Sequence, residues 1–394
     1  MSIALRLGLY YAALFVGSGA SAPYASVWFR AHGLSGAGIG MVLAAPSLGR
    51  AITGPALALW ADGFSLRRTP IAVIAAGVAA AFIGLALTHG FWPWLLLWFV
   101  SQSLFGSMSP LGDVITLRRA RTEGFNYGWP RGIGSAGYIF GNVAMGFLIG
   151  LASPDVLLVW VVIWAVAAAA AALWLLPPDP VHEGGARLPA RERFKGLGEL
   201  VADPVFMLAI VSTGLIQASH GFYYGFSALT WKGQGLPSGL VGVLWGVGVA
   251  AEVGFLWFME PWRRRIGPER LVVLGGFGAL VRWTCLAMSP PLWLLIPLQA
   301  LHALTFTATF MGSLQLMERL APAKSASSAQ TLNSVLSGGL LIGLATMASG
   351  RLFDAVGAHG YLAMSVIAAA GLIGALCLTP LQRARKAKLA ADSA

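Results

Sequence analysis

The sequence predicts an all-α membrane protein with twelve transmembrane helices arranged in two six-helix halves. Hydrophobic residues make up 57% of the chain and charged residues only 10%, whereas soluble domains carry about 25% charged residues. Twelve apolar stretches are each about 20 residues long, which is enough to cross the hydrocarbon core of a bilayer. No stretch alternates as a β-strand would, and helices satisfy their own backbone hydrogen bonds in lipid. Together these observations favour a polytopic helical protein.

The twelve stretches follow one another with short breaks. They cover residues 5–30, 35–60, 69–89, 92–117, 127–150, 154–176, 204–230, 236–260, 270–289, 291–316, 327–350 and 358–380. The breaks carry turn residues and charges, as in HGLSGAG, ADGFSLRR and EPWRRRIGPER. Only Arg6 precedes the first apolar run, and that run is too long for a cleavable signal peptide. We therefore expect it to be the first spanning helix.

The distribution of basic residues predicts the orientation in the membrane. With the N-terminus inside, all but six of the 26 lysine and arginine residues fall in segments on the inner side. The six others are Arg30, Arg50, Arg131, Lys232, Arg282 and Arg351. The positive-inside rule then predicts cytoplasmic termini in a bacterial-type inner (plasma) membrane. The same asymmetry accounts for the net charge of +11, so we expect no nucleic-acid partner.

A polar segment divides the chain. Residues 177–203 are rich in proline, glycine and charge, and they separate a predicted N-terminal half, 1–176, from a C-terminal half with a cytoplasmic tail, 204–394. A faint repeat at one constant offset relates the two halves. It pairs Ser135, Gly137 and Gly141 with Ser337, Gly339 and Gly343. Two parallel six-helix halves are typical of a secondary transporter.

Five charged side chains lie well inside the predicted spans. They are Arg50, Asp113, Arg131, Glu252 and Arg282. Each costs roughly 2.5–3.5 kcal/mol on insertion, so each suggests a function. At about 1.5 Å of rise per residue, Asp113 and Arg131 lie at one depth near the inner face, and Glu252 and Arg282 lie near the midplane. We expect two ion pairs, which could either bind substrate or only lock helices together.

The buried charges leave one arginine without a fixed acidic partner. The three arginines outnumber the two acids, and a substrate carboxylate would match a guanidinium with bidentate geometry. Residues 131, 135, 138 and 142 also fall on one helical face. The predicted substrate-binding residues are Arg131, Asp113, Tyr138, Ser135, Asn142 and Arg50.

Several motifs resemble the lactose-permease branch of the major facilitator superfamily. They are YGWPRGIGSAGYIFG with Asp113 eighteen residues before its arginine, LWGVGVAAEVGFLWF around Glu252, and LQALHALTF around His302. The resemblance covers nearly the whole chain, and within that branch it points most to the phenylpropionic acid permeases. It implies the major facilitator fold and alternating access around a site at the midplane.

The resemblance also implies residue roles. Asp113 and Arg131 would contact substrate and Tyr138 would stack against it, while Glu252 would couple transport to protons together with Arg282 and His302. An acid buried alone takes up a proton and one beside an arginine ionises, which suits Glu252. The inner loop ADGFSLRR would be the gating loop, although Ala58 stands where that motif usually has glycine. Its functional residues would be Asp62, Arg67 and Arg68.

The chain departs from the sugar permeases at the residues that would carry the proton. Thr305 stands one helical turn after His302, where the sugar permease has an acid. The proton site would then move to Glu252 with His302 assisting. The seventh span has Gln217 and His220 instead of the acids of the sugar branch. Both changes argue against a galactoside substrate.

The sequence therefore predicts a proton symporter that takes up a small, phenylpropionate-like aromatic carboxylate. Alternatives are a proton-linked sugar or nucleoside carrier and a drug exporter. A membrane enzyme would need a nucleophile or acid–base constellation that the sequence does not present, so we expect no enzyme activity. We expect a monomer in the bilayer whose partner is a small molecule. We expect no metal, no disulfide between Cys285 and Cys377, and no cofactor beyond the coupling proton.

Overall fold

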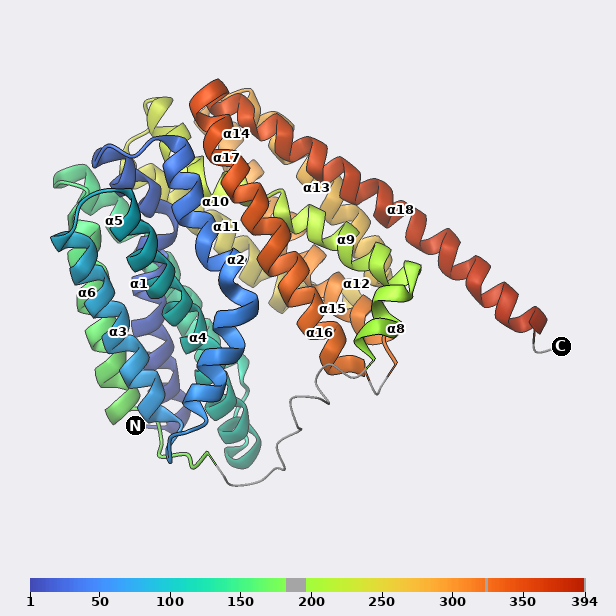
Figure 1. Cartoon of the computed structure of the whole chain (residues 1–394), viewed down its shortest axis with the longest axis horizontal. Helices are drawn as coiled ribbons and strands as arrows, with labels where there is room; N and C mark the ends of the chain where they lie inside the picture. Colours follow the sequence, from blue (N-terminus) through green and yellow to red (C-terminus); the bar gives the residue numbers. More distant parts are fainter. Residues whose placement is uncertain (182–195, 323–324, 393–394) are drawn as a thin grey trace. The chain divides into compact units, whose positions relative to one another are not determined.

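The computed structural model describes residues 1–181, 196–322 and 325–392, and these are helical without a β-strand (Figure 1). The one extended pairing recorded there is an isolated antiparallel bridge between Leu66 and Pro180. The N-terminal part contains α1 (Ile3–Ala31), α2 (Gly36–Ala61), α3 (Arg68–Leu87), α4 (Phe91–Glu123), α5 (Gly128–Leu151) and α6 (Val156–Trp174).

The remaining helices follow the polar segment. They are α8 (Leu197–Ala202), α9 (Pro204–Ala218), α10 (Gly221–Gly233), α11 (Ser238–Phe258), α12 (Glu260–Ile266), α13 (Pro268–Ala287), α14 (Leu292–Ala300), α15 (Thr309–Leu320), α16 (Ala326–Val335), α17 (Ile342–Val356) and α18 (Tyr361–Asp392). Two π-helical segments are inserted among them, η1 (Ala303–Ala308) and η3 (Leu336–Leu341), and η4 (Gly357–Gly360) is a 3₁₀ turn.

Each of the twelve predicted apolar stretches coincides with a helix or a run of helices, so the all-α membrane fold is confirmed. In the part of the chain that the structure describes, ten helical runs are long and apolar enough to cross a membrane. One of the ten, residues 328–382, spans two predicted stretches. The helix α4 is not among the ten, and it carries Asp113 and a cluster of arginines at its C-terminal end.

Local signals explain where several helices begin and end. The side chains of Ser2, Ser35 and Asp203 accept hydrogen bonds from the first free N–H groups of α1, α2 and α9, which is the usual role of an N-cap. Gly124 ends α4 in the left-handed conformation, with φ of 72°, a conformation that glycine adopts without steric cost.

The helices that carry polar residues in the C-terminal part are interrupted. Between α9 and α10 the chain makes a turn at Ser219 and His220. After α14, which contains Pro297, the segment η1 is wound as a π-helix. Discontinuous helices are common at transporter binding sites, and π-segments frequently occur at functional sites. Both interruptions lie beside the polar network described below.

The chain forms two compact units. The first contains Met1–Gly185, Tyr224–Ala250 and Met347–Ala355, and the second contains Ala186–Tyr223, Ala251–Thr346 and Val356–Ala394. These units are defined by contacts, and the division into halves around residues 177–203 stays a prediction. Part of that segment, residues 182–195, lies outside the described residues.

In the first unit, α1 packs against α5 and α6, and α3 packs against α4 and α6 (Figure 1). The approach of α1 to α5 needs glycine. A Cβ added to Gly141 would overlap the carbonyl oxygen of Val16, and one added to Gly19 would overlap that of Tyr138. Small residues let membrane helices approach closely, and here they place the arginine-bearing helix α5 against the aromatic face of α1.

In the second unit, α18 packs against α9 and α13, and α13 also packs against η1 and α15. Large apolar side chains remain exposed on helices of both units, among them Leu151, Phe258 and Val366. A soluble protein rarely leaves so many exposed, whereas lipid-facing helices require them. The packing of α13 against η1 brings Arg282 to the residues around His302.

Candidate functional site

The first polar site surrounds the carboxylate of Asp113 on α4. Its Oδ1 atom accepts hydrogen bonds from the hydroxyl groups of Tyr11, at 2.5 Å, and Tyr127, at 2.9 Å. The Nη1 atom of Arg131 lies 3.5 Å from the same oxygen, at the long end of an ion pair. The predicted pairing of Asp113 with Arg131 is therefore present, but the two tyrosines make the closer contacts.

Arg131 uses one edge of its guanidinium for these contacts. Nη1 donates to the Ser109 hydroxyl at 2.7 Å as well as to Asp113. Among the residues that the structure describes, no protein group accepts a hydrogen bond from its Nη2 or Nε. The side chain is 34% exposed, and its guanidinium lies 5.1 Å from the ring centre of Tyr11 and 5.0 Å from that of Phe15. The Nη2–Nε edge can thus receive an anion.

The other predicted binding residues lie in different surroundings. Ser135 and Tyr138 are half-buried on α5. Asn142 is fully buried and donates to the backbone carbonyl of Tyr138 at 2.9 Å, so its amide N–H is used within its own helix. Arg50 is exposed on α2, and no polar contact to it is found within the described part of the chain.

The second polar site joins Glu252 on α11, His302 at the junction of α14 and η1, and Arg282 on α13. Glu252 Oε1 lies 3.1 Å from His302 Nε2. His302 Nδ1 lies 2.8 Å from Arg282 Nη1. The sequence predicted a direct Glu252–Arg282 pair. The structure instead places His302 between them, with Nε2 toward Glu252 and Nδ1 toward Arg282.

Polar and aromatic groups enclose Arg282, which is fully buried. Its Nη2 donates to Gln299 Oε1 at 2.8 Å and its Nη1 donates to Thr305 Oγ1 at 3.2 Å. The guanidinium also lies 4.5 Å from the ring centre of Tyr223 and 4.7 Å from that of Trp283. Charged hydrogen bonds and cation–π contacts of this kind offset the loss of hydration on burial.

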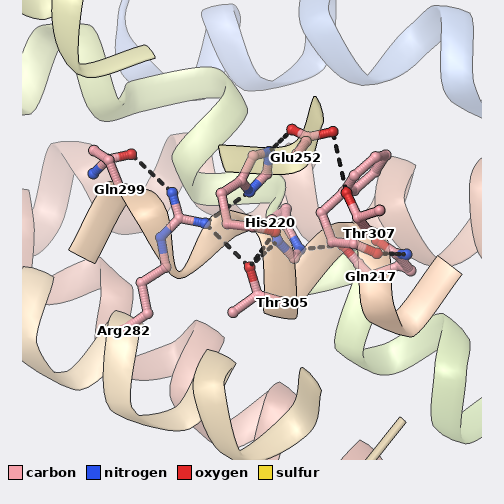
Figure 2. A network of polar contacts seen from close by, with 9 residues as sticks. Gln217, His220, Glu252, Arg282, Gln299, Thr305 and Thr307 are labelled. Carbon is pink, nitrogen blue, oxygen red and sulfur yellow. Dashed lines mark hydrogen bonds and ion pairs between the residues drawn. The ribbon is translucent and has the colours of Figure 1, made fainter. Parts of the chain in front are cut away.

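Two further contacts extend the network. Thr307 donates to Glu252 Oε2 at 3.3 Å. His220, at the turn between α9 and α10, lies 3.0 Å from Thr305 through its Nε2 and 3.1 Å from the carbonyl oxygen of Gln217 through its Nδ1. Figure 2 shows these side chains converging from several helices. Thr305 therefore belongs to the network even though it is no acid.

The predicted gating loop contacts the start of the polar segment. Arg67 Nε lies 3.3 Å from Asp179 Oδ2, and Arg118 Nη1 lies 3.0 Å from Asp179 Oδ1. The backbone N–H of Arg67 also donates to the carbonyl oxygen of Asp179 at 2.9 Å. Arg68 donates to backbone carbonyls at the end of α6, those of Leu173 and Leu176. Asp62 lies in the same loop.

Sequence reasoning missed several of these residues. They are Tyr11, Ser109, Tyr127, Asp179, Gln299 and Thr307. Hydroxyl and amide groups are common enough in membrane helices that their presence alone singles none out, although Gln299 stands in the LQALHALTF motif. Asp179 was visible as an acid next to an apolar helix, but nothing in the sequence connected it to the loop at residues 62–68.

The described residues hold no group of three or more His, Cys, Asp or Glu side chains that could bind a metal. Cys285 and Cys377 are free. The chemistry available at both sites is therefore hydrogen bonding, ion pairing, aromatic contact and proton exchange. These suit recognition of a small anion and exchange of protons.

Comparison with known proteins identifies relatives over nearly the full length. Residues 3–363 match the family model described as the MFS_1 like family. The chain is 27% identical over 371 residues to a probable 3-phenylpropionic acid transporter of Escherichia coli (strain K12), covering 92% of this chain and 94% of that protein. It is 29% identical over 390 residues to a maltose permease of Geobacillus stearothermophilus, covering 95% and 94%.

A solved structure shows the same fold at low sequence identity. The nucleoside transporter NupG superposes with a TM-score of 0.81 at 16% identity, covering 96% of this chain and 99% of that one. At this identity the likeness establishes the architecture and leaves the substrate open.

Proposed function

This chain belongs to the MFS_1-like family of membrane transporters, and on that premise we propose that it takes up a small aromatic carboxylate together with protons. Uptake would proceed by alternating access, with the substrate at Arg131 and the coupling proton at Glu252. The proposal places both termini in the cytoplasm of a bacterial cell, with the protein acting as a monomer in the plasma membrane. It requires no cofactor other than the proton.

The observation that carries the substrate class is the open edge of Arg131. Its guanidinium is fixed by Ser109 and by two aromatic rings, while Nη2 and Nε have no partner among the described residues. A carboxylate can bind two parallel N–H groups of an arginine at once. Asp113 competes only weakly for this role, since Tyr11 and Tyr127 already donate to it.

The apolar part of the substrate would pack against aromatic side chains near this edge. Phe15 contacts the Arg131 guanidinium, and Tyr138 lies two helical turns along α5 from Arg131. Aromatic pairs contribute roughly 0.5–1.5 kcal/mol beyond the area that they bury. The similarity to a probable 3-phenylpropionic acid transporter supports the same class, and 3-phenylpropionate is the ligand to try first.

The coupling role rests on the second polar site. Glu252 is the acid of that site, and it contacts His302 and Thr307 rather than a cation directly. An acid with such neutral neighbours can gain and lose a proton without breaking an ion pair of its own. Arg282 lies one residue further along the network, so its movement would change the charge balance around Glu252.

The test uses proteoliposomes in a lightly buffered medium with an external pH electrode. Addition of 3-phenylpropionate should make the medium alkaline, and liposomes that contain an Arg131→Gln protein should give no signal. Maltose and uridine serve as probes of the two other substrate classes suggested by the maltose permease and the nucleoside transporter. Alkalinisation with either neutral solute, and none with 3-phenylpropionate, would overturn the proposed substrate while leaving the transporter fold in place.

A further inference from the structure

The hydrogen bonds around Arg282 have directions that chemistry fixes. A guanidinium has donors only, so His302 Nδ1, at 2.8 Å from Nη1, must accept. The single ring proton of His302 is then on Nε2, from which it is donated to Glu252 Oε1 at 3.1 Å. Protonation of both ring nitrogens would place an N–H group against the guanidinium. The structure therefore assigns His302 one tautomer.

The same reasoning fixes the tautomer of His220. A backbone carbonyl can only accept, so His220 Nδ1 carries the proton that is donated to Gln217 at 3.1 Å. The Nε2 atom of His220 is then an acceptor for the hydroxyl of Thr305 at 3.0 Å. The Thr305 oxygen in turn accepts from Arg282 Nη1 at 3.2 Å. A second chain of hydrogen bonds thus leads from Arg282 through Thr305 to His220, which the proposed mechanism does not use.

One nitrogen of Arg282 belongs to both chains of hydrogen bonds. Nη1 binds His302 Nδ1 and Thr305 Oγ1 together, so these two acceptors are close neighbours with a cation between them. The π-helical winding of η1, which begins directly after His302, places Thr305 in this position. If Arg282 moves away, the Thr305 hydroxyl is free to rotate and donate to His302 Nδ1.

We propose that His220 and Thr305 belong to the proton path of this transporter, which runs from His220 Nε2 through Thr305 and His302 to Glu252, and that Arg282 keeps it closed in the present arrangement. The inference rests on the proposed proton coupling. It adds His220 and Thr305 to the proton path. It also assigns Arg282 a gating role, because the path opens only when the Arg282 guanidinium moves away.

The proton balance of the path is complete. A proton bound at His220 Nε2 passes to the Thr305 oxygen as the Thr305 hydroxyl proton passes to His302 Nδ1. The proton on His302 Nε2 then passes to the carboxylate of Glu252. The result is a neutral Glu252 carboxylic acid, a neutral His220 and a His302 that carries its proton on Nδ1. One proton has moved, and only O–H and N–H bonds have formed or broken.

The groups around His220 support a role as a proton acceptor that is controlled by the position of Arg282. Its ring lies 4.9 Å from that of Trp283, 5.3 Å from that of His302 and 6.0 Å from that of Phe306. The titratable and charged groups that face His220 among the described residues are His302 and Arg282, and Glu252 lies beyond His302. A positive charge on His220 beside Arg282 would be repelled strongly in an apolar interior, so His220 can accept a proton only after Arg282 has withdrawn.

The first test reads the tautomers directly. Nitrogen-15 spectra of histidine-labelled full-length protein in lipid separate protonated from bare ring nitrogens, and His220→Gln and His302→Gln proteins assign the signals. We expect protonated Nε2 on His302 and protonated Nδ1 on His220. The opposite tautomer at either ring would overturn the proposal, whether or not any substrate is transported.

The second test measures the path itself. Thr305→Val removes the hydroxyl at nearly constant volume, and Thr305→Ser keeps it. Thr309→Val is the matched control because the buried Thr309 hydroxyl has no hydrogen-bond partner among the described residues. With labelled 3-phenylpropionate in proteoliposomes, proton-driven uptake by Thr305→Val should fall about a hundred-fold, the size typical of a positioned proton-transfer group. Substrate exchange by Thr305→Val should stay near the wild-type rate. Proton-driven uptake by Thr305→Ser and by Thr309→Val should also stay near the wild-type rate.

The two tests separate this inference from the proposed function. If 3-phenylpropionate is not transported by the wild type, the proposed substrate is wrong. The tautomers of His302 and His220 then still decide whether the two chains of hydrogen bonds exist. If transport occurs and Thr305→Val retains proton-driven uptake, the symporter stands and the path through Thr305 is wrong.

Discussion

The arginines of the two polar sites, Arg131 and Arg282, differ in how many of their N–H groups the protein engages. The Arg131 side chain is 34% exposed and makes its polar contacts through one nitrogen. Arg282 is fully buried and donates to a glutamine, a histidine and a threonine. An arginine with an open edge can bind an anion, whereas one enclosed by the protein can act only by moving.

The acids beside the two arginines show the same difference. Asp113 is contacted by two tyrosines and, more loosely, by Arg131 itself. Glu252 is separated from Arg282 by His302. In the first site the acid helps to hold the arginine near its rings, and in the second the acid is left available for a proton. The comparison supports the proposal that Arg131 recognises the substrate and that Glu252 couples transport to protons.

The largest effect should follow from replacing Arg131 with lysine. Arg131→Lys keeps the positive charge and loses the paired N–H groups, each worth about 1.5–3 kcal/mol when bonded to a charged partner. Uptake of labelled 3-phenylpropionate at low concentration should fall about a hundred-fold. Arg264→Lys is the matched control, since Arg264 is exposed and pairs with Glu260 on its own helix. Near-normal affinity in Arg131→Lys would show that the open edge is not the binding site.

A selective effect should follow at the coupling site. Glu252→Gln keeps a hydrogen-bonding group next to His302 and Thr307 and cannot exchange a proton. Labelled substrate should no longer accumulate against its gradient, while exchange of internal for external substrate continues because it needs no net proton movement. Persistent uphill accumulation in proteoliposomes with an imposed pH gradient would remove Glu252 from the coupling role.

A moderate loss of stability should follow from removing a partner of Arg282. Gln299→Leu deletes the acceptor 2.8 Å from Nη2 and leaves a buried charged donor unsatisfied, at a cost of about 1.5–3 kcal/mol. The measurement is thermal unfolding in detergent. Gln102→Leu on α4, where the amide nitrogen has no hydrogen-bond partner in the described part of the chain, should leave the melting temperature nearly unchanged. Equal shifts in the two proteins would mean that Gln299 contributes nothing specific.

The smallest effect should come from the tyrosines at Asp113. Tyr127→Phe removes one donor from the carboxylate, which then becomes a stronger competitor for Arg131. The KM for 3-phenylpropionate should rise several-fold, in keeping with the 0.5–1.5 kcal/mol of about one neutral hydrogen bond. Tyr11→Phe should act in the same direction and more strongly, because its contact is shorter. A lower KM in either protein would reverse the role given to Asp113.

The sequence was sufficient to predict the fold because hydropathy and charge act over whole segments. Runs of apolar residues do not depend on fine geometry. The depth estimate likewise brought Asp113 and Arg131 together, since it placed both at a similar distance from the predicted inner face, and their side chains are 3.5 Å apart.

The direct Glu252–Arg282 contact was wrong for a definable reason. Depth gives the height of a residue along the membrane normal and says nothing of the rotation of its helix. In the structure Thr305, within the π-helical segment η1, contacts Arg282, and His302 lies between the two charges. No pattern of residue types in the sequence predicts a π-helical segment at this position. The contacts of Tyr11 and Tyr127 with Asp113, and that of Asp179 with Arg67, likewise depend on tertiary packing, which local sequence patterns do not predict.

The most direct test of the division between the two arginines is a binding measurement. Titration calorimetry would compare 3-phenylpropionate with its neutral amide, 3-phenylpropanamide, on the wild type and on Arg131→Gln. We predict that the wild type prefers the acid by at least about ten-fold, or 1.4 kcal/mol, and that Arg131→Gln loses this preference. Equal binding of acid and amide by the wild type, or a preference for the acid that survives in Arg131→Gln, would contradict the account.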